Sequence, residues 1–124
     1  MRTPSAAYAR VDLDARIEAS SGGDLTRICL EEAVAALGQA LIALRRKPAT
    51  FPRDALTRAH GIAVHLARSV APDSPMHDAL VQFYGGLAAS LARNMAEPRL
   101  EEIAQARVDF QDLLSVAGEC RRSV

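Results

Sequence analysis

Residues 83–94 read FYGGLAASLARN, and they combine a helical pattern with two adjacent glycines. Large apolar side chains recur there every three or four residues, which is the spacing of one face of an α-helix. Each glycine inside a helix costs about 0.5–1 kcal/mol relative to alanine, because the unfolded chain loses more backbone freedom at glycine. We therefore expect a close approach by another backbone, from this chain or from a partner, to offset the cost of Gly85 and Gly86.

The same helical periodicity extends along most of the 124 residues, and no β-like alternation accompanies it. Four helices are predicted, at about residues 21–47, 50–70, 74–94 and 98–118. The connections between them are short, which favours antiparallel packing of consecutive helices. The sequence therefore predicts an all-α protein that folds as an antiparallel up-and-down four-helix bundle.

A chain of this length fits one bundle domain with short extensions at both ends. We divide it into an N-terminal arm or short helix over residues 1–20, the bundle over 21–118 and a C-terminal tail over 119–124. The arm carries Tyr8 and Ile17 among charged residues and fits none of the four helices. We expect it to be either mobile or laid over the surface of the bundle.

Local chemistry marks the ends of the predicted helices. Ser74 suits an N-cap, and Pro75 suits the first helical position, where the missing N–H has no partner to lose. Gly118 suits the C-cap of the last helix. The basic residues at 45–47 and 121–122 suit helix C-termini, where the helix dipole is negative.

The third predicted helix has two different faces. Its main apolar stripe, which we expect in the core, consists of Met76, Leu80, Phe83, Tyr84, Leu87 and Leu91. At about 100° per residue, Gly85 points away from the centre of that stripe and shares its side with Val81, Ala88 and Ala92. An outward helix face is normally charged, whereas this one is smooth. Either the protein's own elements cover it, or it is an exposed groove for a partner's apolar helix.

Composition argues against several functional classes. The formal net charge is zero and aromatic residues make up only 4%, which argues against nucleic-acid binding. No apolar run reaches the ~20 residues of a membrane span, and the first residues lack the apolar stretch of a signal peptide. Cys29 and Cys120 are distant in sequence and fit free thiols in a reducing compartment. We expect a cytoplasmic protein.

Catalytic and cofactor motifs are missing from the sequence. His60 and His65 are five residues apart and would project about 140° apart on a helix, so they cannot share a metal ion. Neither a Glu-x-x-His motif nor a glycine-rich phosphate loop is present. We expect no enzymatic activity, no cofactor and no metal. One alternative is a histidine-phosphotransfer-like signalling bundle that uses His60, although the lysine and glycine expected just after such a histidine are absent.

Several motifs together resemble the flagellar secretion chaperones (FliS), a family of small helical bundles. The Ala-Tyr at 7–8 matches the start of that family, and residues 30–40 are similar to its first-helix motif, with Glu31 in place of the usual Tyr. Residues 83–94 follow its third-helix motif, with the glycine pair replacing a polar and an aromatic residue. Residues 100–103 resemble the start of its last helix, but the usual terminal Trp is missing.

The resemblance implies a chaperone in the bacterial cytosol that binds the C-terminal segment of flagellin. Binding would prevent premature polymerisation before flagellar type III secretion. Combined with the smooth face, it predicts these cargo-binding residues: Val81, Gly85, Ala88 and Ala92, flanked by Tyr8 and Ile17 of the arm. Other flagellar export components are further candidate partners, and an adaptor bundle for another export protein is a second alternative. The motif residues expected in the core are Leu30, Phe83, Tyr84, Leu87 and Leu91.

Overall fold

The computed structural model describes residues 22–122, and every regular element in that part of the chain is an α-helix. The helices are α2 (Gly22–Arg46), α3 (Arg53–Ser69), α4 (His77–Ala96) and α5 (Leu100–Arg122). The predicted arm, with Tyr8 and Ile17, lies outside the described residues.

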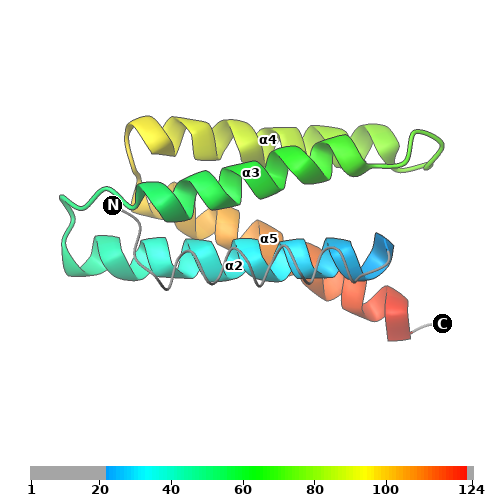
Figure 1. The fold of residues 1–124 in the computed structure, drawn as a ribbon, viewed down its shortest axis with the longest axis horizontal. Coiled ribbons are helices and arrows are strands. Elements are labelled where there is room, and N and C mark those ends of the chain that lie inside the picture. The colour runs from blue at the N-terminus through cyan, green and yellow to red at the C-terminus, as the bar shows by residue number, and fades with distance from the viewer. Residues whose placement is uncertain (1–21, 123–124) are drawn as a thin grey trace.

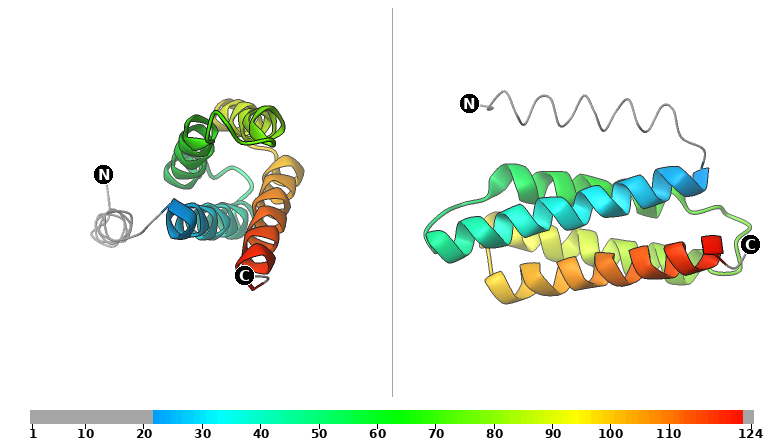
Figure 2. Two further views of the ribbon diagram at one scale, coloured as in Figure 1. Left: turned by 90° about the vertical axis from the view of Figure 1, so that its right-hand side faces the viewer. Right: turned by 90° about the horizontal axis from the view of Figure 1, so that it is seen from below.

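Consecutive helices run in opposite directions along one common axis (Figure 1). Viewed down that axis they form a ring, in which each helix contacts the next and α5 returns to contact α2 (Figure 2). The α3–α4 and α2–α5 pairs pack most closely, and α4 contacts α5 most sparsely. The predicted antiparallel up-and-down four-helix bundle is confirmed.

The core of the bundle is built mainly from aliphatic side chains, with Phe110, Tyr84 and Cys29 among them. The largest fully buried side chains are Phe110, Leu30, Leu37, Leu56, Leu91, Ile103 and Asn94. Alanines take the remaining positions, with Ala33 and Ala40 of α2 and Ala59 and Ala63 of α3 completely inaccessible. Such small side chains allow α2 and α3 to approach each other without leaving voids.

Most of the motif residues expected in the core are buried, namely Leu30, Tyr84, Leu87 and Leu91. The prediction for Phe83 is wrong, because its side chain is 42% exposed and its ring meets Tyr84 edge-on, with ring centroids 6.4 Å apart. Met76, also assigned to the stripe, is 56% exposed. Phe83 lies at the edge of the stripe that turns toward α5, the neighbour that α4 contacts least.

Two predicted helix ends differ from the observed ones. α4 begins at His77, two residues after Pro75, and its N-cap is Met76 in place of Ser74. The Ser74 hydroxyl instead accepts a hydrogen bond from the Met76 N–H at 3.2 Å, in the turn before the helix. Gly118 does not end α5, which continues to Arg122 and so includes residues assigned to the tail. A glycine C-cap requires a left-handed conformation, and none of the described glycines has a positive φ.

Candidate functional site

The glycine pair of α4 lies in open space. Gly85 and Gly86 are both exposed, and a Cβ atom built on either would meet no atom within 4 Å beyond its own stretch of helix. No backbone from the described part of the chain approaches them. The cost of the pair is therefore not offset inside the described bundle, which leaves the space available to a partner.

The four small residues that the sequence places on the outer face of α4 differ in their exposure. Gly85 and Ala92 are exposed, whereas Val81 and Ala88 are half-buried. Ala88 packs against the core. Val81 comes four residues before Gly85, and Ala88 comes four residues before Ala92. Because four residues exceed one helical turn by about 40°, Val81 and Ala88 are rotated toward α3, the helix that packs closely against α4. The four residues therefore do not share one open face, as the sequence suggested.

A groove lies on the other side of α4, between this helix and α5. Its volume is about 270 Å³. It is lined by Gly86, Leu87, Ser90 and Arg93 of α4 and by Glu102, Gln105, Ala106 and Asp109 of α5. Leu87 and Ala106 are buried and form its apolar floor, while the polar side chains stand along its two rims. We refer to this feature as the α4–α5 groove.

Small side chains on α4 help to open this groove. Gly86 and Ser90 fill little of the space beside α5, and Phe83, one turn before Gly86, presents a partly exposed ring on the same side of the helix. The groove was missed in the sequence because Phe83 was assigned to the core. A signal for the groove exists in the sequence: helical spacing places four residues on one side of α4, namely Phe83, Gly86, Ser90 and Arg93.

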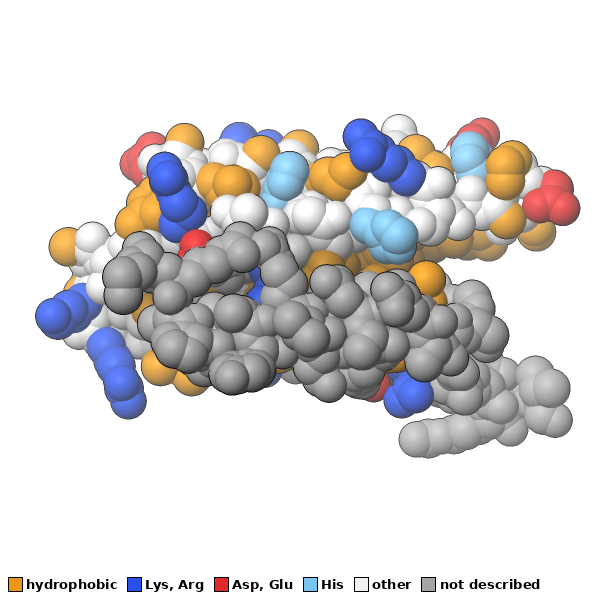
Figure 3. All heavy atoms as spheres, viewed as in Figure 1, with side chains coloured by type: hydrophobic (Ala, Val, Ile, Leu, Met, Phe, Trp, Pro, Cys, Tyr) orange, Lys and Arg blue, Asp and Glu red, His pale blue; other side chains and the backbone are white. Residues whose placement is uncertain are grey.

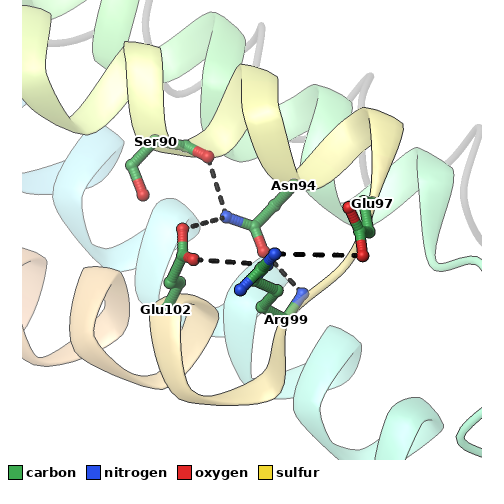
Figure 4. Close-up of polar contacts among 5 residues, drawn as sticks. All are labelled: Ser90, Asn94, Glu97, Arg99 and Glu102. Atoms are coloured by element: carbon green, nitrogen blue, oxygen red, sulfur yellow. Dashed lines mark hydrogen bonds and ion pairs between the residues drawn. The ribbon is translucent and has the colours of Figure 1, made fainter.

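A buried amide joins the two helices at the end of the bundle where α4 turns into α5 (Figure 4). The Asn94 side chain is 1% exposed. Its Nδ2 donates to the Ser90 carbonyl at 2.8 Å and to Oε1 of Glu102 at 3.2 Å. Its Oδ1 accepts a hydrogen bond from the Arg99 backbone N–H at 2.7 Å. One side chain thus joins the last turns of α4 to the first turn of α5.

Charges around the turn between α4 and α5 are partly compensated. Arg99 lies 3.9 Å from a carboxylate oxygen of Glu97 and 3.7 Å from one of Glu102 (Figure 4). Arg93 of α4 and Asp109 of α5 stand on opposite rims of the groove. The groove therefore offers an apolar floor with both signs of charge at its edges, which suits an amphipathic segment better than a uniformly charged ligand.

A smaller groove of about 210 Å³ lies near the opposite end of the bundle. It is lined by Thr26, Leu66, Ser69, Val70, Ala71, Ser74, Leu80 and Tyr84. These residues surround the connection between α3 and α4, and neither glycine of the pair contributes to it. This second groove therefore does not explain the glycines.

The histidines are dispersed along α3 and α4. His60 is half-buried and His65 is exposed. The Ser69 hydroxyl donates a hydrogen bond to the His65 carbonyl at 2.7 Å, and its oxygen lies 3.4 Å from Nε2 of the His65 ring. No lysine accompanies His60 on α3, since the chain's lysine is Lys47. These surroundings give a phosphorylated His60 no cation of the expected kind.

Burial raises the pKa of the Cys29 thiol, and the carboxylate of Glu32 raises it further. The thiol therefore stays protonated near neutral pH, and a buried protonated thiol is a poor nucleophile. Burial likewise raises the pKa of the Tyr84 hydroxyl. Among residues 25–116, whose side chains the structure describes, no three His, Cys, Asp or Glu side chains gather closely enough to hold a metal ion.

The open glycine pair carries a direct stability prediction. Gly86→Ala should raise the free energy of unfolding by about 0.5–1 kcal/mol, because alanine restricts the unfolded chain and its Cβ meets no neighbour here. Gly38→Ala is the matched comparison: its Cβ would lie 3.4 Å from Nε of Arg107, so we expect a smaller gain. Urea denaturation measures both, and a loss of stability in Gly86→Ala would contradict an open face.

Comparison with known proteins gives no match for this chain: no family model, no curated protein and no solved structure aligns with it significantly. The likeness to the flagellar secretion chaperones rests on the residues quoted from the sequence.

Proposed function

We propose that this bundle is a non-catalytic binding protein that holds an amphipathic segment of a partner against α4. The observation that carries the proposal is the open glycine pair beside the α4–α5 groove. Without side chains at Gly85 and Gly86, a partner's backbone can approach α4 more closely than it could beside larger residues. The apolar surface covered in this way contributes about 25 cal/mol per Å².

The exposed residues of α4 indicate which side chains the partner's segment would contact. The α4 side of the groove is formed by Gly86, Leu87, Ser90 and Arg93. Phe83, one turn before Gly86, adds a partly exposed ring that the segment could also contact. Of the residues predicted from the sequence, Gly85 and Ala92 are accessible, whereas Val81 and Ala88 stand at the edge nearest α3. Tyr8 and Ile17 remain predicted flanking residues outside the described part of the chain.

The partner that we propose is the C-terminal segment of flagellin, held in the bacterial cytosol before type III secretion. The support is the order of motifs that resembles the flagellar secretion chaperones, together with the four-helix architecture. A segment that is disordered when free loses entropy on binding, and this cost lowers the net affinity. The complex can then cover a large surface and still release its cargo.

The test uses two glycine substitutions of the same kind. Gly86→Leu fills the α4–α5 groove, and we expect it to weaken binding of a flagellin C-terminal peptide by about tenfold or more, since about 1.4 kcal/mol corresponds to each factor of ten. Gly61→Leu is the matched control, because Gly61 is also exposed on a helix and its Cβ would also meet nothing within 4 Å. Calorimetric titration measures binding, and circular dichroism verifies the fold of each variant.

Each outcome of this experiment is informative. Selective loss of binding in Gly86→Leu supports the groove, whereas equal binding by both variants argues against it. If the unmodified protein does not bind the flagellin peptide, the proposed cargo is wrong. Defined binding of another purified export protein would then favour the adaptor alternative.

Ala88→Glu, the substitution that the sequence alone would suggest, is a less specific probe. Ala88 packs against the core, so a glutamate there would disturb the bundle as well as any partner. Ala92→Glu places the same charge on an exposed position of the same helix. We therefore expect Ala92→Glu to retain the helical circular dichroism signal while weakening peptide binding.

A further inference from the structure

The end of the bundle where α2 passes into α3 carries an exposed cluster of cations and apolar side chains. We call it the basic tip, and it consists of Ile42, Arg45, Arg46, Lys47, Phe51 and Arg53. All of these residues are exposed, with Ile42 at 54% and Phe51 at 41%. In the space-filling view, Lys and Arg side chains project from this end of the molecule (Figure 3).

Within the part of the chain that the structure describes, the cations of the basic tip form no ion pair with an acidic side chain. The ion pairs of the described residues involve Arg27, Arg58, Arg99 and His77, and none involves a cation of the basic tip. Asp54 is the only acidic residue within the stretch from position 42 to 54. The basic tip therefore carries a clear local excess of positive charge in a chain whose formal net charge is zero.

Helix electrostatics account for only part of the cluster. Arg45 and Arg46 lie in the last turn of α2, where a cation is favourable. Arg53, however, is the first residue of α3, where the helix dipole is positive and a cation is unfavourable. The Arg53 guanidinium lies 5.4 Å from the centroid of the Phe51 ring, so that a cation and an exposed aromatic surface are presented together.

From this arrangement we propose that the basic tip docks on a membrane surface that contains anionic lipid. Cations near such a surface attract the phosphate-bearing headgroups, and adjoining apolar side chains can enter the interface below them. The basic tip is a projecting end of the bundle, and the two grooves described above are lined by other residues. A projecting end suits a broad surface, whereas a peptide ligand would need a groove.

The mode of contact is peripheral. Among residues 22–122, no helix has the length and apolar character needed to cross a bilayer. Asp73 of the connection between α3 and α4, and Asp78 in the first turn of α4, lie at the opposite end of the bundle (Figure 1). The turn between α4 and α5 lies at the same end as the basic tip and carries Glu97, Glu101 and Glu102 together with Arg99, so the attraction to an anionic surface is confined to the basic tip itself.

Vesicle co-sedimentation of the full chain tests this proposal. We expect binding to equimolar phosphatidylcholine–phosphatidylglycerol vesicles and none to phosphatidylcholine alone. Lys47→Gln combined with Arg53→Gln should weaken binding by about thirtyfold, since each basic residue near an anionic surface contributes about 1 kcal/mol. Lys47→Gln alone and Arg68→Gln alone form the matched tip variant and control: each removes one positive charge, and Arg68 is exposed in the last turn of α3, at the other end of the bundle.

A second variant separates lipid from other anions. Phe51→Ala should also reduce vesicle binding, because the ring enters the interface, and it should not alter binding to an acidic peptide. The proposal is overturned if the control loses as much binding as the tip variant. It is also overturned if polyglutamate binds as tightly as the anionic vesicles and Phe51→Ala has no effect on either, since the partner is then an acidic polypeptide.

Discussion

Replacing Phe110 by alanine is expected to lower the free energy of unfolding by about 3–5 kcal/mol. Phe110 is completely inaccessible and belongs to the core cluster to which all four helices contribute. The substitution removes apolar surface from the core and leaves a cavity that the surrounding helices can close only in part. An urea denaturation curve measures the loss, and a bundle of this size can lose a large fraction of its stability in this way.

Val108→Ala provides the control for this substitution. Val108 lies on the same helix but is 45% exposed, so its truncation should change the free energy of unfolding by no more than about 0.5 kcal/mol. Similar losses in both variants would mean that α5 does not present the Phe110 face to the core.

Replacing Asn94 by alanine is expected to cost about 2–3 kcal/mol, which is large for a polar residue. The substitution removes the acceptor for the Arg99 N–H and the donor to the Ser90 carbonyl and the Glu102 carboxylate. Buried groups that lose their partners bear a desolvation penalty of about 1–3 kcal/mol. Denaturation with urea again measures the effect.

Gln105→Ala is the matched control, because Gln105 also uses its amide as a donor, to Asp109 at 3.0 Å, but at an exposed site. It should change stability by about 0.5 kcal/mol or less. Asn94 also holds Glu102, which lines the α4–α5 groove, so Asn94→Ala should weaken peptide binding if the groove is the cargo site. Equal stability of the two variants would show that Asn94 does not tie α4 to α5.

The exposed glycines link stability to the proposed function. A helix with Gly85 and Gly86 in open space is less stable than the same helix with alanines, and the described bundle contains nothing that offsets this. Surfaces that serve a partner commonly retain such destabilising features. The opposite responses expected for stability and for cargo binding in Gly86 variants distinguish this explanation from simple tolerance of a weak helix.

The architecture could be predicted from the sequence because its determinants are local. Apolar spacing and the prolines identified every helix that the structure describes, and the buried positions Leu30, Leu87 and Leu91 follow from the 3.6-residue period. Errors at helix ends were small, as at Ser74, except at Gly118, where the helix continues. A residue that can terminate a helix does so only when the following residues stop forming helical hydrogen bonds.

The candidate site could be predicted only in part. Periodicity placed Gly85 on the outer side of α4, and its exposure agrees with that. Periodicity could not tell which flank of α4 a neighbouring helix covers. Val81 and Ala88 turned out to be half-buried, whereas Phe83, expected in the core, is partly exposed beside the groove. The difference depends on how far α4 lies from α3 and from α5.

The burial of Asn94 could not be predicted from the sequence either. From the sequence, an asparagine near the end of a helix suggests a solvent-exposed position. Only the turn into α5 brings the Arg99 N–H and the Glu102 carboxylate within hydrogen-bonding distance of its amide, which permits its burial.

The sequence by itself determined that this chain forms helices, where they lie and which side of each is apolar, because these properties depend on residues within a few turns of one another. The tertiary structure decided that the α3–α4 contact is close, that the α4–α5 contact is sparse, and that a groove opens beside Gly86. Those distances depend on the combined volumes of side chains from all four helices, which no local pattern contains.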